Sequence, residues 1–191
     1  MAKELRLEDI PGRIFLDTCT VNFILDNGEC IFENEPPSGG IRKRELDDIE
    51  ALRLLFLSGQ RAQWQLAVSP STYEEISATP DDKRRYYLDN WFNDIWQHWL
   101  NVIEESSDVP DFEDAQHISN KLLKSSRFNV LPGEKDRVLL CDSIAFNCDC
   151  FCTRDYRTIL KYRNRIPNLS IKILSPKELI DIIKPFLALW L

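Results

Sequence analysis

Short apolar runs alternate along this chain with longer stretches in which apolar residues recur at every third or fourth position. The short runs are typical of buried strands, and the longer spacing is typical of helices with one apolar face. The expected strands cover residues 13–16, 65–68, 150–153 and 170–174. Because a helical stretch follows each strand, we predict an α/β fold with a central, mainly parallel sheet.

Helical patterns fill most of the sequence between these strands. The expected helices cover residues 18–25, 44–58 and 133–147, with others beginning near Pro70, Tyr156 and Pro176. Ser69-Pro70 and Ser175-Pro176 each supply an N-cap followed by proline, which suits the first helical position. Gly59 is expected to end the helix at 44–58.

Two stretches add to this core. Residues 26–40 combine Gly, Asn and Glu with a Pro-Pro-Ser-Gly-Gly run, which indicates a loop insertion. Residues 81–124 contain a long helix with an aromatic stripe and a second helix from residue 112. We predict that the two helices form an antiparallel hairpin and that the stripe packs in the core, with a base-stacking surface as the alternative. Residues 1–191 are expected to form a single domain with these two elaborations.

The composition, with 43% hydrophobic and 29% charged residues, is ordinary for a soluble globular protein and excludes the disordered class. There is no apolar run long enough to span a bilayer. Residues 1–10 alternate charged and apolar side chains and lack the hydrophobic centre of a signal peptide, so we expect a cytoplasmic protein.

The six cysteines are then expected to be reduced thiols. Cys148, Cys150 and Cys152 fall at every second residue, whereas zinc sites use pairs spaced by two to four residues and a second pair elsewhere. On a strand, this spacing places all three on one face. We expect buried side chains that pack as small apolar groups.

The formal net charge of −7 argues against a nonspecific polyanion binder. Two divalent cations bound among the acids would raise it from −7 to about −3 and reverse the local field. Local basic clusters remain at residues 42–44 and 83–85 and between Arg154 and Arg165. Each cluster either contacts phosphate groups or forms a solvated face.

Four acids fall where strands and helices meet. Asp17 ends the first strand, Glu75 lies in the helix after the second, Asp136 in the helix before the third, and Asp155 just after the third. Ligands of open α/β sheets bind outside the carboxyl ends of the strands, so these acids can share one site. Clustered carboxylates suit hard cations such as Mg²⁺. The alternative is a solvated acidic rim.

Two nearby acids compete with these assignments. Glu74 points about 100° away from Glu75 on the same helix. Asp142 lies about 240° round its helix from Asp136 and replaces it if the helix register differs.

The strand Ile14-Phe15-Leu16-Asp17-Thr18, the segment from Val68 to Ile76 and the stretch from Asp136 to Asp155 together resemble a PIN domain. This family of metal-dependent nucleases includes the toxin ribonucleases of bacterial toxin–antitoxin pairs. The resemblance covers most of the chain in the right order. The insertions at 26–40 and 81–124 are longer than in the compact members of the family.

The resemblance implies a PIN-like α/β/α sandwich and an endoribonuclease that hydrolyses RNA with one or two Mg²⁺ or Mn²⁺ ions. Asp17, Glu75, Asp136 and Asp155 would be both the metal ligands and the catalytic residues, and we refer to them as the acidic quartet. The implied partners are an RNA substrate and a cognate antitoxin, if one exists; homodimer formation is left open.

The resemblance also extends to neighbouring polar residues. Thr153 matches a hydroxyl residue that often precedes the final acid, where it could orient a carboxylate. Thr18 and Asn22 either line the same mouth or have capping and packing roles.

Two other functions compete with the nuclease. A phosphatase of the haloacid dehalogenase type needs a second Asp two residues after Asp17, where this chain has Cys19. The stronger rival is a non-catalytic PIN-fold module that binds protein or RNA. The loop at 26–40 and the apolar segment 182–191 would then offer contact surfaces.

Overall fold

The computed structural model describes residues 6–37 and 39–191. Residues 1–5, which belong to the N-terminal segment predicted not to be a signal peptide, and Ser38, within the expected loop, lie outside the described residues. In the described part, no helix is both long enough and apolar enough to cross a membrane.

Four short strands form one parallel sheet. They are β1 (Arg13–Leu16), β2 (Gln65–Ala67), β3 (Cys150–Cys152) and β4 (Lys172–Leu174). Their spatial order is β2-β1-β3-β4, and every neighbouring pair is parallel. The strands lie where the apolar runs predicted them, and the prediction of a mainly parallel sheet in an α/β fold is confirmed.

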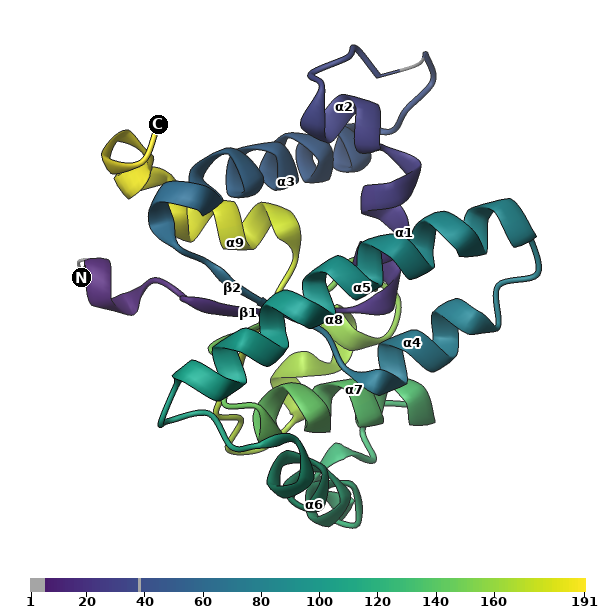
Figure 1. The fold of residues 1–191 in the computed structure, drawn as a ribbon, viewed down its shortest axis with the longest axis vertical. Coiled ribbons are helices and arrows are strands. Elements are labelled where there is room, and N and C mark those ends of the chain that lie inside the picture. The colour runs from purple at the N-terminus through teal and green to yellow at the C-terminus, as the bar shows by residue number, and fades with distance from the viewer. Residues whose placement is uncertain (1–5, 38) are drawn as a thin grey trace.

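Helices cover both faces of this sheet (Figure 1). They are α1 (Thr18–Asp26), α2 (Gly28–Phe32), α3 (Lys43–Ala62), α4 (Pro70–Ser77), α5 (Asp82–Glu105), α6 (Phe112–Leu123), α7 (Glu134–Ala145), α8 (Ile159–Tyr162) and α9 (Pro176–Ile183). Short 3-10 turns occur at Leu7–Asp9, Ser126–Phe128, Arg163–Arg165 and Lys184–Leu189. As the Ser-Pro pairs predicted, α4 and α9 begin directly after Ser69 and Ser175.

The alternating side chains of the strands divide the core into two layers. Ile14 and Leu16 of β1 pack in a cluster with α1, α3 and α9, whereas Phe15 packs in a second cluster with α6 and α7. The Phe15 and Phe151 rings stack with their centroids 5.6 Å apart, which joins β1 to β3 in the second layer. Helix α5 spans both layers, since Phe92 belongs to the first and Trp99 to the second. The aromatic stripe is therefore core packing.

The expected hairpin of α5 and α6 is wrong. Helix α6 packs mainly along α7, and Figure 1 shows it beneath α7 at the bottom of the view, joined to the end of α5 by a loop. A polar contact helps to hold it there: the Ser119 hydroxyl of α6 donates to Oδ1 of Asp142 on α7, at 2.5 Å. The apolar stripe of α6 predicts which face of the helix is buried, but it does not predict the helix against which that face packs.

Three local predictions also need correction. The expected loop at 26–40 contains α2, whose Ile31 is buried against α3. Helix α3 continues past Gly59 and ends before Gln63, which takes the left-handed conformation with φ of 55°. A Cβ atom at Gly59 would lie 3.1 Å from the Trp64 ring, so this glycine makes room for Trp64. Cys148 packs in the second layer, not with Cys150 and Cys152.

Candidate active site

The order of the strands creates a crevice between β1 and β3. The chain leaves β1 towards β2 on one side and returns to β3 on the other side of β1. At such a switch point the two connections diverge, and the carboxyl ends of the strands are left open to a ligand. Asp17 follows β1 directly, and its N–H donates to the carbonyl of Cys152 at 3.1 Å. Asp17 and the segment after β3 therefore lie together at the edge of the sheet formed by the carboxyl ends of the strands.

All four acids of the quartet line one cavity of about 630 Å³. Asp17 comes from the end of β1, Glu75 from α4, Asp136 from the first turn of α7, and Asp155 from the loop after β3. Other walls of the cavity carry basic side chains, which are Arg42, Arg44, Arg154 and Arg157. Carboxylates and guanidinium groups thus share one hollow at the switch point.

Asp17 is almost fully buried, at 4% exposure. Its Oδ2 accepts a hydrogen bond from the Thr153 hydroxyl at 2.5 Å and lies 2.7 Å from the Cys19 thiol. Burial raises the pKa of Asp17 to about 6, although these two hydrogen bonds lower it. The charges of Asp136 and Glu75 add to the rise. Burial also raises the pKa of Cys19 well above its usual range, so the thiol stays protonated as a donor.

Asp155 and Asp136 meet at Thr158. The carboxylate of Asp155 accepts the N–H groups of Arg157 and Thr158, each at 2.8 Å, and the Thr158 hydroxyl. This hydroxyl also lies 3.3 Å from Oδ2 of Asp136. Burial, followed by the charge of Asp155, raises the pKa of Asp136. Gly133 leaves the Asp136 carboxylate room, because a Cβ atom there would collide with it.

The structure separates the quartet from its competitors. Glu74 is exposed and does not line the cavity, whereas Glu75 does. Asp142 lines a different hollow of about 50 Å³ and accepts hydrogen bonds from Ser119 at 2.5 Å and Ser71 at 3.0 Å. It therefore ties α4 and α6 to α7, and Asp136 is the α7 acid that faces the cavity.

Of the three polar residues expected near the acidic quartet, Thr153 contacts an acid of the quartet, whereas Thr18 and Asn22 lie elsewhere. Thr153 does orient the Asp17 carboxylate, and its hydroxyl oxygen accepts the N–H of Asp155 at 3.0 Å. Thr18 and Asn22 are not among the cavity-lining residues. Asn22 donates to the Thr18 carbonyl at 2.9 Å and accepts from Arg84 at 2.8 Å, which ties α1 to α5.

The donor chemistry of the quartet fits a hard cation, because all four groups offer carboxylate oxygens. Their present arrangement is not a finished metal cage. Among the described residues, no three His, Cys, Asp or Glu side chains are grouped so as to hold a metal ion. Oδ2 of Asp17 and the carboxylate of Asp155 already accept hydrogen bonds from the protein, so a cation would share these groups with the donors.

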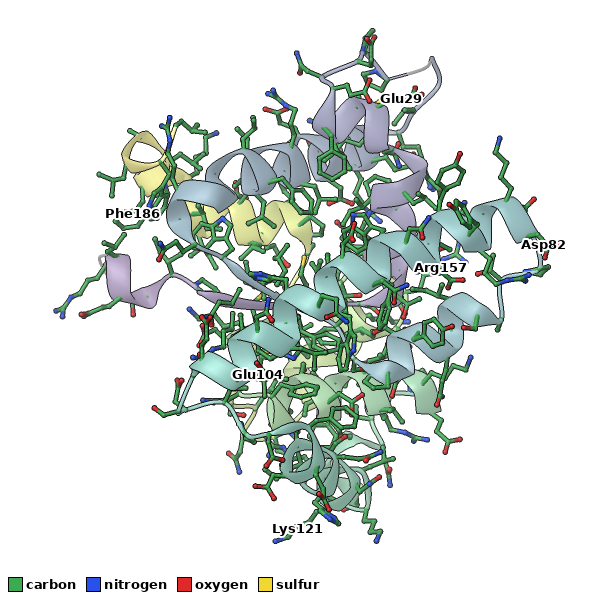
Figure 2. All side chains as sticks on the ribbon, viewed as in Figure 1. Glu29, Asp82, Glu104, Lys121, Arg157 and Phe186 are labelled. Carbon is green, nitrogen blue, oxygen red and sulfur yellow. The ribbon has the colours of Figure 1, made fainter. Side chains whose placement is uncertain are left out.

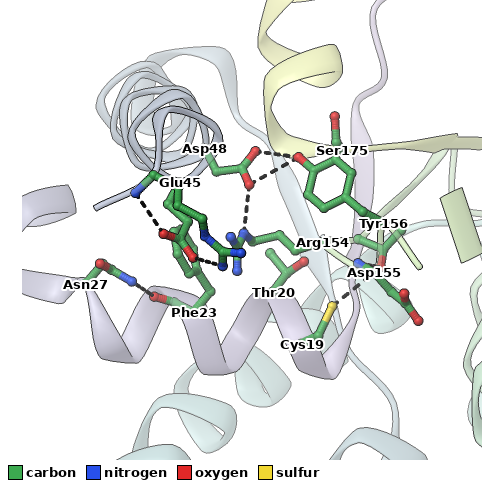
Figure 3. Close-up of polar contacts among 12 residues, drawn as sticks. Cys19, Thr20, Phe23, Asn27, Glu45, Asp48, Arg154, Asp155, Tyr156 and Ser175 are labelled. Carbon is green, nitrogen blue, oxygen red and sulfur yellow. Dashed lines mark hydrogen bonds and ion pairs between the residues drawn. The ribbon is translucent and has the colours of Figure 1, made fainter. Parts of the chain in front are cut away.

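The sequence did not reveal Asp48. This α3 residue has no exposed surface, and its carboxylate accepts Nε–H of Arg154 at 2.9 Å and the Tyr156 hydroxyl at 2.9 Å (Figure 3). The Arg154 guanidinium carbon lies 3.3 Å from the centroid of the Phe23 ring. Asp48 falls in register with buried Leu52 of α3, and an acid on an apolar helix face is the signal that was available.

The buried carboxylate also acts on its hydroxyl partner. Burial raises the pKa of Tyr156, and the negative charge of Asp48 raises it further, so Tyr156 remains a neutral donor. Asp48 thereby fixes two side chains that line the cavity.

Comparison of the chain with protein-family models, with curated proteins and with solved structures gave no match.

Burial of the Asp17 carboxylate predicts a pH-dependent cost to stability. Its pKa rises on folding from 3.8 to about 6, so the cost is absent below pH 3.8 and complete above pH 6. We expect Asp17→Asn to increase the free energy of unfolding by up to about 3 kcal/mol at pH 8 and to have little effect at pH 4. Urea titrations with chelator present, with Glu74→Gln as control, measure this. An Asp17→Asn variant that is less stable than wild type at pH 8 would contradict it.

The ion pair of Asp48 and Arg154 predicts that substitutions at the two positions have strongly non-additive effects on the free energy of unfolding. Asp48→Leu leaves the Arg154 charge without its partner, and Arg154→Met leaves Asp48 buried and charged, so each should cost about 3–5 kcal/mol. The double variant should recover most of this loss, because both charges are removed. Urea unfolding of the four proteins measures the coupling energy; additive losses would show that the pair is not coupled.

Proposed function

We propose that the cavity is the active site of a metal-dependent endoribonuclease that hydrolyses RNA phosphodiester bonds. One observation carries the proposal: the acidic quartet, contributed by four separate segments, lines a single cavity with four arginines at the switch point of a parallel sheet. The order of these acids along the chain and the resemblance to PIN domains support the same function. A PIN-like α/β/α sandwich is the corresponding fold proposal.

The acidic quartet would hold one or two Mg²⁺ or Mn²⁺ ions. When bound, such an ion supplies positive charge that stabilises the negative charge developing on the phosphate oxygens. Burial is the main cause of the raised pKa values of Asp17 and Asp136, and repulsion by neighbouring acids of the quartet adds to it. A divalent cation would relieve this repulsion.

The chain's own basic residues would bind and orient the phosphate. Asp48 holds Arg154 through Nε, and Phe23 supports the face of its guanidinium group. Within the described part of the chain, neither Nη atom of Arg154 makes a hydrogen bond, so both are available to phosphate oxygens. A guanidinium group recognises phosphate through two parallel hydrogen bonds, which orient the phosphate as well as bind it.

Thr153 and Cys19 would set the direction of the Asp17 carboxylate. Both contact the same oxygen, Oδ2, which leaves Oδ1 as the oxygen without a hydrogen-bond donor in the described structure. Thr153 also accepts the Asp155 N–H, so the positions of the first and last acids of the quartet are linked through one hydroxyl group.

The second candidate is a non-catalytic PIN-fold module that binds RNA or protein. The hydrogen bonds that Asp17 and Asp155 accept from the protein favour it, because carboxylates held in this way can serve a structural role. The arginines of the cavity would then bind phosphate or an acidic protein surface, and the hydrogen-bonded carboxylates would be structural.

Cleavage assays separate the two candidates. We expect wild-type protein to cut single-stranded RNA with Mg²⁺ or Mn²⁺ and to lose activity with chelator. Asp17→Asn and Asp155→Asn change volume little but each remove a charged ligand, so each should reduce cleavage by at least about 100-fold. Gel electrophoresis of end-labelled RNA measures the rates.

Glu75→Gln and Glu74→Gln provide a matched pair, because the same change is made at neighbouring positions of α4. Only the first should abolish cleavage. Full activity in Asp17→Asn or Glu75→Gln would refute the assigned site, and no cleavage by wild type with either metal would favour the binding module.

A further inference from the structure

A second hollow of about 480 Å³ adjoins the cavity. Arg44 and Tyr156 line both, so the two hollows share a wall. The second hollow lies among α3, α8 and the start of α9, with Asp47, Lys161 and Ser175 among its lining residues. The quartet does not line it.

The charges of this second hollow are mostly paired by the protein itself. Glu178 forms two hydrogen bonds with Arg163, each at 2.6 Å, and Lys177 pairs with Asp181 at 2.5 Å. Within residues 6–37 and 39–191, Arg44 and Lys161 lie over the rings of Tyr156 and Tyr162 and make no ion pair. Asp47 is the remaining acid of the hollow, so the two unpaired cations outnumber it.

The shared wall is held in place from behind. The Tyr156 hydroxyl donates to buried Asp48 at 2.9 Å, which fixes the ring (Figure 3). The Arg44 guanidinium carbon lies 4.4 Å from the centroid of that ring. Cation–π contact keeps Arg44 over Tyr156 at the junction of the two hollows. A cation in this position can contact a phosphate group that passes from one hollow to the other.

We propose that the second hollow is a subsite for the strand that flanks the scissile phosphate, with Arg44 and Lys161 binding a neighbouring phosphate group. The proposal rests on the proposed nuclease function. The ligand is a single-stranded polynucleotide, because an unpaired strand can bend into two adjoining hollows more readily than a base-paired duplex. Ligand-binding hollows of this size suit one small unit each, so two adjoining hollows favour a ligand longer than one nucleotide.

Fluorescence anisotropy with a labelled 12-nucleotide single-stranded RNA, with chelator present to prevent cleavage, tests the subsite. Arg44→Ala and Lys161→Ala should each weaken binding about 5- to 10-fold at low salt. Each should also reduce the slope of log affinity against log salt by about 0.7, the value for one lost phosphate contact on a single strand. Lys121→Ala is the control, because Lys121 lies on α6 away from Arg157 (Figure 2).

Binding measurements with a shorter ligand and with a duplex provide two further tests of the subsite. A dinucleoside monophosphate has one phosphate and should compete equally well for wild type and Lys161→Ala. An RNA duplex of the same length should bind more weakly than the single strand. No binding of the 12-mer by wild type, losses no larger than that of Lys121→Ala, or tighter binding of the duplex would each overturn the subsite.

The outcome distinguishes the subsite from the nuclease. Binding that depends on Lys161, without cleavage under any metal condition, supports the subsite and rejects the enzyme. Metal-dependent cleavage with binding that is insensitive to Arg44 and Lys161 supports the enzyme and rejects the subsite.

Discussion

The parallel pairing of β1 with β3 is the constraint on which the candidate site depends. In this register Leu16 lies opposite Cys152, so Asp17 and Thr153 follow side by side. The Thr153 hydroxyl can then reach the Asp17 carboxylate, and the Thr153 oxygen can accept the Asp155 N–H. A slip by one residue would turn every side chain of β1 to the opposite face and separate these groups. The stacked rings of Phe15 and Phe151 help to fix the register from the core.

Around β1 and β3, the carboxylates of the acidic quartet and the arginines of the cavity lie close together but, in the described part of the chain, are not paired with one another. Asp17 is buried among hydrogen-bond donors that are themselves uncharged, so its carboxylate remains costly to ionise. Arg154, in contrast, is paired with an acid outside the quartet, Asp48. Asp48 compensates the arginine's charge while leaving part of its guanidinium group towards the cavity. Under the proposed function, this separation would let one hollow offer carboxylates to a cation and guanidinium groups to phosphate.

The sequence predicted the features that depend on local chemistry. Short apolar runs located all four strands, and the Ser-Pro pairs located the starts of α4 and α9. The spacing of acids relative to strands located a set that does line one cavity. These predictions succeeded because each depends on a periodicity or on a residue at an element boundary.

The failures concern contacts between distant segments. Nothing in the α6 stripe says that Asp142 of α7 would bind Ser119, so α6 was assigned to the wrong partner. Gly59 was expected to end a helix, but its role is to admit Trp64. The sequence does not reveal the role of Asp48, because its two partners lie more than a hundred residues away, although its place on an apolar helix face is itself unusual.

The central claim is that the acidic quartet binds a divalent cation, and isothermal titration calorimetry with Mn²⁺ tests it most directly. Wild type and Glu74→Gln should show the same saturable binding, and Asp17→Asn should bind at least about tenfold more weakly, because one charged ligand is lost. Absence of saturable binding in wild type, or equal affinity in Asp17→Asn, would contradict the claim.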